Sequence, residues 1–127
     1  MEFKSDRYFT VFDFFISHSQ LLIRSSKNDE NKSNIDIVFF DVKFIQLGIY
    51  YNGLRLKLRK GDIPPTIAKE YLTDEECNLF EIESKDEKAY VIAGLVHIYE
   101  NSLDFNESSL GVLQYKGRDT LILNLSL

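Results

Sequence analysis

Short runs of alternating apolar and polar residues recur along the chain, and turn-forming residues separate them at intervals of about 8–12 residues. In one such run, Leu54 to Arg59, three leucines alternate with three cationic residues. A period of two places successive side chains on opposite faces of an extended strand. Alanine, the strongest helix former, occurs only three times in the 127 residues. We therefore predict a mainly β protein, an antiparallel barrel or sandwich of about 7–9 strands, with a β-rich α+β fold as the alternative.

The length and composition predict a single globular domain that spans residues 1–127. A chain of this size buries one core and is too short for two ordinary ones. The balance of 44% hydrophobic and 28% charged residues is typical of a globular protein. A domain of this composition is expected to fold without a partner.

The apolar and sulfur-containing residues predict a soluble, cytoplasmic location. The apolar stretch Phe9–Ile16 follows Asp6 and Arg7 and is interrupted by Asp13, so we expect no signal peptide. No run approaches the roughly 20 apolar residues of a membrane-spanning helix. The single cysteine, Cys77, cannot form an internal disulfide, which favours a reducing compartment.

Several local patterns place strands and turns in the first half of the chain. Lys27–Asn34 has no apolar residue and is expected to be an exposed hairpin loop. The apolar face changes parity at Phe39-Phe40, which predicts a β-bulge there or, alternatively, a strand buried on both faces. Asn52-Gly53 between extended segments predicts a hairpin turn. Leu54–Lys60 and Leu79–Ser84, if paired, would form a ladder of ion pairs across neighbouring strands.

The second half contains one expected interruption of the β structure. Pro64 and Pro65 are suited to open a short helix near residues 65–77, at Thr66–Leu72, with a capping box at Thr73–Glu76. Ala89–Tyr99 is apolar on both faces and is predicted to be a central strand, with a bulge or a bend at Gly94. Further predictions are a loop at 101–109 and two last strands at Leu110–Tyr115 and Leu121–Leu127, the second of which would make the C-terminus structural.

Catalytic candidates are few, and each has a simpler structural interpretation. His18 lies between Ser17 and Ser19, but neighbouring side chains of an extended segment point to opposite faces. His97 lies within an apolar strand. Asp13, Asp36 and Asp41 interrupt apolar strands and would form an acid pair only if two of them met. We therefore expect no enzyme, and retain His18, Asp13 and Asp41 as an alternative site.

The same residues give no sign of a metal or a cofactor. With only two histidines in the chain, a zinc site would need both of them together with carboxylates or Cys77. Glu75 and Glu76 precede Cys77 and oppose formation of a thiolate, so we expect no catalytic cysteine. No phosphate-binding loop is present, and we predict no metal and no cofactor.

Charge is distributed unevenly along the chain. Residues 1–60 hold ten Lys/Arg against seven Asp/Glu, whereas residues 61–127 hold five against thirteen. The acidic second half argues against nucleic acid and against an anionic membrane surface as partners. It suggests a protein-binding surface for a basic partner, formed by six carboxylates: Glu70, Asp74, Glu75, Glu76, Glu81 and Glu83.

These observations favour a binding module over an enzyme. At the level of a class, small acidic β-rich bacterial proteins that neutralise a toxin or nuclease have this profile. The alternative is a β-barrel that holds a small apolar ligand, because eleven of the seventeen aromatic residues precede residue 52. Self-association is compatible with either hypothesis, and the surface ladder of ion pairs is the competing structural explanation of the charges.

Overall fold

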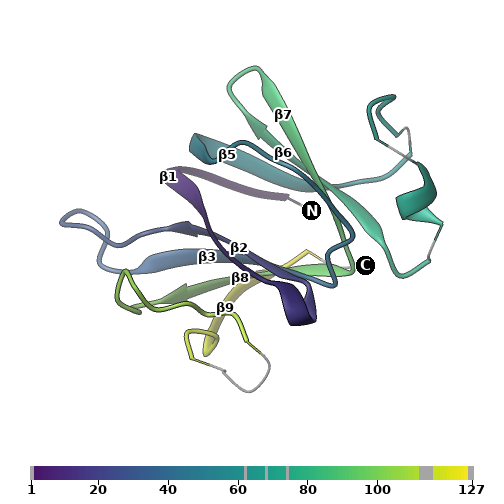
Figure 1. Cartoon of the computed structure of the whole chain (residues 1–127). Helices are drawn as coiled ribbons and strands as arrows, with labels where there is room; N and C mark the ends of the chain where they lie inside the picture. Colours follow the sequence, from purple (N-terminus) through teal and green to yellow (C-terminus); the bar gives the residue numbers. More distant parts are fainter. Residues whose placement is uncertain (1, 62, 68, 74, 112–115, 126–127) are drawn as a thin grey trace.

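Nine strands form one antiparallel sheet in a computed structural model of the chain, which describes residues 2–61, 63–67, 69–73, 75–111 and 116–125 (Figure 1). The order across the sheet is β4-β7-β6-β5-β1-β2-β3-β8-β9. The predicted mainly β, antiparallel class is confirmed. The strands are β1 (Glu2–Phe15), β2 (Gln20–Ser25), β3 (Asn34–Phe40), β4 (Phe44–Gln46), β5 (Tyr50–Arg59), β6 (Asn78–Ser84), β7 (Glu87–Ala93), β8 (Leu95–Asn101) and β9 (Thr120–Asn124).

The sheet folds over on itself along β1. The first part of this long strand pairs with β5 and its last part pairs with β2, so that Thr10 lies beside both Tyr50 and Arg24. The register shifts between Ser5 and Tyr8 on one side and between Val11 and Asp13 on the other, and such irregularities bend a strand. Figure 1 shows β5, β6 and β7 in one half and β2, β3, β8 and β9 in the other. The sheet does not close into a barrel, so the sandwich-like alternative describes it.

The core lies between the two halves of the folded sheet. Phe39 of β3 meets Phe80 of β6 edge-on, with 6.0 Å between ring centroids, and both side chains are fully buried. Phe9 and Tyr51, two of the aromatic residues that would line a cavity in the alternative ligand-binding barrel, are packed in this core. The buried members are Phe9, Leu21, Ile23, Ile37, Phe39, Val42, Tyr51, Leu54, Leu56, Phe80, Ile82, Ala89, Val91, Ala93, Val96, Ile98 and Leu125.

Two bent connections between consecutive strands join the halves of the folded sheet. β7 continues into β8 through Gly94, and β3 continues into β4 through residues 41–43. The Gly94 amide donates to the Phe40 carbonyl at 2.8 Å, where a Cβ on Gly94 would lie 3.3 Å from that of Asp41. The bend predicted at Gly94 is therefore confirmed, and it divides the predicted single strand into two.

Two predictions about β3 and β5 are corrected by the structure. β3 pairs in register with both β2 and β8, so there is no bulge at Phe39-Phe40, and the strand is covered on both faces. Phe39 points into the core, whereas Phe40 packs on the outer face with Leu22 and its neighbours. Asn52-Gly53 is not a hairpin turn but lies inside β5, where Gly53 has φ +76 opposite the irregular part of β1.

Non-strand segments cover the outer faces of the sheet. The predicted helix at 66–72 is reduced to the 3₁₀ turn η2 (Lys69–Leu72), and a second 3₁₀ turn, η1 (Ile16–His18), joins β1 to β2. The predicted loops at 27–34 and 101–109 are confirmed, apart from strand ends. Leu110 and Gly111 are not in a strand, and residues 112–115 of the predicted strand lie outside the described residues, as do 126 and 127. No helix in the described part of the chain is long and apolar enough to cross a membrane.

Candidate functional site

The predicted ladder of ion pairs is present on the outer face of β5 and β6. Arg55 lies opposite Glu83 and Lys57 opposite Glu81 in the antiparallel register. Arg55 Nη1 is 3.6 Å from Glu83, and Lys57 Nζ is 3.3 Å from Glu81. Two of the six carboxylates of the predicted acidic surface are therefore matched by cations on the neighbouring strand.

Glu81 is the most tightly held of these carboxylates. Its side chain is fully buried, with Arg59 Nη1 at 2.5 Å and Lys88 Nζ at 3.9 Å from Oε1. Burial alone would raise the pKa of Glu81, but the cationic groups of Lys57 and Arg59 beside the carboxylate outweigh it and hold that pKa below its usual value. Glu81 thus anchors a group of cations that would otherwise repel one another.

The pKa of Glu81 predicts how acid affects the protein. Because the carboxyl has a lower pKa in the folded state than its usual 4.5, the unfolded chain takes up the proton first as the pH falls. Stability from this group is present above about pH 4.5 and is lost as the pH falls through the lower, folded-state pKa. We expect Glu81→Gln to flatten this part of the stability profile, measured by urea unfolding between pH 7 and pH 3.

The matched control for this measurement is Glu83→Gln. It removes a carboxylate of the same ladder whose side chain is 33% exposed. An exposed ion pair contributes little to stability, so this variant should retain the acid dependence of the wild type. Equal flattening in both variants would contradict a special role for Glu81.

The remaining carboxylates of the predicted surface lie on the segment between β5 and β6. Ile67 and Cys77 bury their side chains against Leu79 and Ile92 of the sheet, and Leu72 packs beside them. The ring of Tyr71 in η2 is tilted against that of Phe44 in β4, with 5.3 Å between ring centroids. This anchoring holds the segment on the outer face and leaves Glu70, Glu75 and Glu76 exposed, while Asp74 lies outside the described residues.

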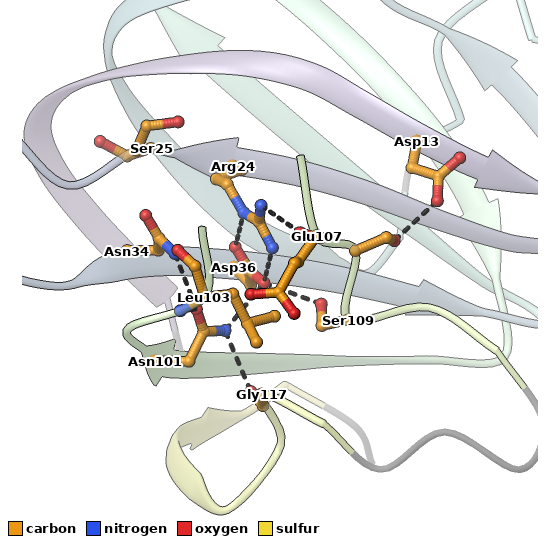
Figure 2. Close-up of polar contacts among 12 residues, drawn as sticks. Asp13, Arg24, Ser25, Asn34, Asp36, Asn101, Leu103, Glu107, Ser109 and Gly117 are labelled. Carbon is orange, nitrogen blue, oxygen red and sulfur yellow. Dashed lines mark hydrogen bonds and ion pairs between the residues drawn. The ribbon is translucent and has the colours of Figure 1, made fainter. Parts of the chain in front are cut away.

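The outer face of β2, β3 and β8 carries a buried polar cluster that the sequence reasoning did not assign (Figure 2). Arg24 and Asp36 are 1% and 0% exposed and form a bidentate ion pair. Arg24 Nε donates to Asp36 Oδ1 at 2.6 Å, and Nη2 donates to Oδ2 at 2.9 Å. Asp36 Oδ2 also accepts from Asn101 Nδ2 at 2.9 Å and from Ser109 Oγ at 2.7 Å. The carboxylate is therefore fully occupied by protein donors.

The same cluster holds segment 102–111 against the sheet. Arg24 Nη1 donates to the Glu107 carbonyl at 2.6 Å, and its guanidinium lies 4.1 Å from the centre of the Phe12 ring. Asn34 Nδ2 donates to the Leu103 carbonyl at 2.9 Å. Each of these bonds joins a strand residue to the covering segment, as Figure 2 shows. The arrangement is that of a structural clamp, since every charge in it is paired inside the protein.

The residues considered for catalysis are not brought together. Asp13 accepts from Ser108 Oγ at 2.6 Å, and Asp41 lies 3.0 Å from Lys43 Nζ. His18 Nδ1 is 3.0 Å from the Ser17 hydroxyl, because residues 16–18 form a 3₁₀ turn rather than an extended bend, and both side chains are exposed. The two side chains do not diverge as they would on an extended chain, and His18 is a locally hydrogen-bonded polar residue; no third group is hydrogen-bonded to this pair within the described chain.

His97 belongs to the clamp side of the sheet. Its Nδ1 is 2.9 Å from the Tyr99 hydroxyl, and its ring packs edge-on against Phe40. Burial, and secondly the positive charge of Arg118, lower the pKa of His97. The half-buried imidazole serves as a hydrogen-bonding strand residue, as its place in an apolar strand indicated.

One signal in the sequence could have revealed the clamp. Arg24 and Asp36 are each the single charged residue within a strand of apolar neighbours, in Gln20–Ser25 and Asn34–Phe40. Buried charges in proteins are usually paired, so two opposite charges in consecutive strands of a hairpin are candidates for one pair. The contributions of Asn101 and Ser109 depend on the path of a loop and left no such signal.

Neither metal ligation nor similarity assigns a role to these groups. No three His, Cys, Asp or Glu side chains within the described ranges are arranged to hold a metal ion. Comparison of the chain with protein-family models, with curated proteins and with solved structures found no match. The exposed carboxylates between β5 and β6 and the clamp are therefore interpreted from their own geometry.

Proposed function

We propose that the protein is a binding module that recognises a basic protein partner through the segment 69–76, which we call the acidic segment. It contains Lys69 and four carboxylates, Glu70, Asp74, Glu75 and Glu76. An inhibitor of a cationic enzyme, such as a nuclease or toxin, is one protein of this kind.

The observation that carries this proposal is the contrast between the two groups of carboxylates. Glu81 and Glu83 are buried or half-buried and face cations on β5. Glu70, Glu75 and Glu76 are instead exposed, on a segment that is held to the sheet by the buried side chains of the flanking Ile67 and Cys77. A charged segment fixed to a rigid sheet loses little conformational freedom when a partner binds. Tyr71, 39% exposed within the segment, adds an aromatic contact of the kind enriched at interfaces.

The proposal is tested by affinity capture from a lysate of the source organism with the immobilised protein. The variant Glu70→Gln/Glu75→Gln/Glu76→Gln should retain the partner about ten- to a hundredfold less well, because three charges that attract and orient it are removed. Raising the salt concentration should release the partner from the wild type, since the Debye length falls from about 10 Å at 0.1 M to about 3 Å at 1 M.

The matched control neutralises three exposed carboxylates on another part of the surface: Asp29, Glu30 and Asp104. It has the same net charge as the first variant, so it separates a local surface from an overall charge effect. Two results would contradict the proposal. One is a partner that both variants lose to the same degree, and the other is a capture in which no protein is retained differently by the two variants.

A further inference from the structure

The β9 strand at one end of the sheet exposes apolar side chains. Within the described chain β9 pairs with β8 alone, and Leu121 and Ile122 are 49% and 45% exposed. An edge strand presents backbone amides and carbonyls that can pair with another strand. β9 combines this pairing capacity with two large apolar side chains.

β9 has few of the features that usually keep an edge strand from pairing. Residues 120–127 contain no ionisable side chain and no proline, whereas edge strands are commonly guarded by lysine, other charges or proline. At the other end of the sheet, β4 has three residues and follows the exposed ion pair of Lys43 with Asp41. The two ends therefore differ, and β9 is the one suited to pairing.

We propose that β9 pairs with β9 of a second copy of this chain, antiparallel and about a two-fold axis at Ile122. In this arrangement Leu121 lies opposite Leu123 of the second copy, and Thr120 opposite Asn124. No like charges meet, and apolar side chains face one another across the strands. The uncharged, nearly palindromic order of Thr120–Asn124 makes the strand complementary to itself, which is what selects a second copy as the occupant.

The irregularity in β9 does not bury its apolar side chains. The register with β8 shifts between Ile98 and Tyr99, opposite Leu121–Leu123, and a bulge can help to protect an edge. Here the two residues beside the shift, Leu121 and Ile122, are both about half exposed. The apolar surface of the edge thus stays available to a partner strand.

Pairing through β9 is compatible with binding at the acidic segment but independent of it. The acidic segment packs on β4, β6 and β7, at the opposite end of the strand order from β9. Figure 1 places β9 and the segment before β6 on opposite sides of the molecule. A dimer would therefore present two acidic segments, which allows bivalent binding.

The first test is the oligomeric state as a function of concentration. Sedimentation equilibrium of the wild type from about 5 µM to about 1 mM should show a monomer–dimer equilibrium. Ile122→Lys should raise the dimer dissociation constant about tenfold or more, because it places two like charges opposite each other at the axis. Ile16→Lys, the same change at a residue of η1 that is 83% exposed, should leave the equilibrium unchanged.

A cross-linking experiment tests the register. In a Cys77→Ala background, Ile122→Cys should form a disulfide-linked dimer under mild oxidation, since paired residues across antiparallel strands lie within disulfide reach. Ile16→Cys is the control. A monomer over the whole concentration range, an equal effect of the two lysine variants, or no more cross-linking at 122 than at 16 would each overturn the proposal.

Discussion

Replacing Asp36 with alanine should lower the free energy of unfolding by about 3–5 kcal/mol, the range measured when one partner of a buried ion pair is removed. The variant leaves the guanidinium of Arg24, 1% exposed, without its carboxylate. Asn101 and Ser109 lose an acceptor at the same time. Urea unfolding followed by circular dichroism would give the change in free energy.

The double variant Arg24→Met/Asp36→Leu separates the unpaired charge from the clamp. It leaves no unpaired charge, so we expect it to recover much of the stability lost in Asp36→Ala. It still lacks the bond from Arg24 to the Glu107 carbonyl, so amide hydrogen exchange in segment 102–111 should be faster than in the wild type. A double variant as unstable as the single one would contradict this explanation.

Replacing Phe80 with alanine should cost about 3–5 kcal/mol, because it removes a fully buried ring and leaves a cavity between the two halves of the sheet. The ring contacts Phe39 across the core. Thermal or urea unfolding measures the loss. Phe105→Ala, at a ring that is 84% exposed, is the matched control and should change stability by less than about 0.5 kcal/mol.

A double-mutant cycle with Phe39→Ala tests the contact itself. If the two halves of the sheet pack through these rings, the cost of the two changes together should differ from the sum of the single costs by about 0.5–1.5 kcal/mol. Strict additivity would mean that Phe39 and Phe80 stabilise their halves separately.

The sequence predicted those parts of the fold that depend on local patterns. Alternation in Leu54–Arg59 identified a strand with a cationic outer face, and the polar run Lys27–Asn34 identified a hairpin loop. The ladder between this strand and Leu79–Ser84 also followed, because alternating charges in two strands constrain their pairing. In these cases the decisive information lies within a few residues of the feature.

Features that depend on distant contacts were not predictable in the same way. Asn52-Gly53 has the residues of a turn, but β1 pairs alongside it, and the positive φ of Gly53 accommodates an irregularity in β1 instead. Phe40 suggested a bulge because the sequence does not show that segment 102–111 covers the outer face of β3. The sequence likewise did not show which carboxylates of the predicted acidic surface stay exposed, because this depends on which of them face the cations of β5.

The shared position of β1 has a consequence for how the protein is made. This strand, Glu2–Phe15, is synthesised before both of its neighbours, and its partner β5 begins only at Tyr50. A nascent chain can form the local hairpins of β1, β2 and β3 early, while the side of β1 that will meet β5 stays unpaired. Pairing of such distant segments slows folding, so the interval before β5 leaves the ribosome is when a newly made chain is most exposed to aggregation.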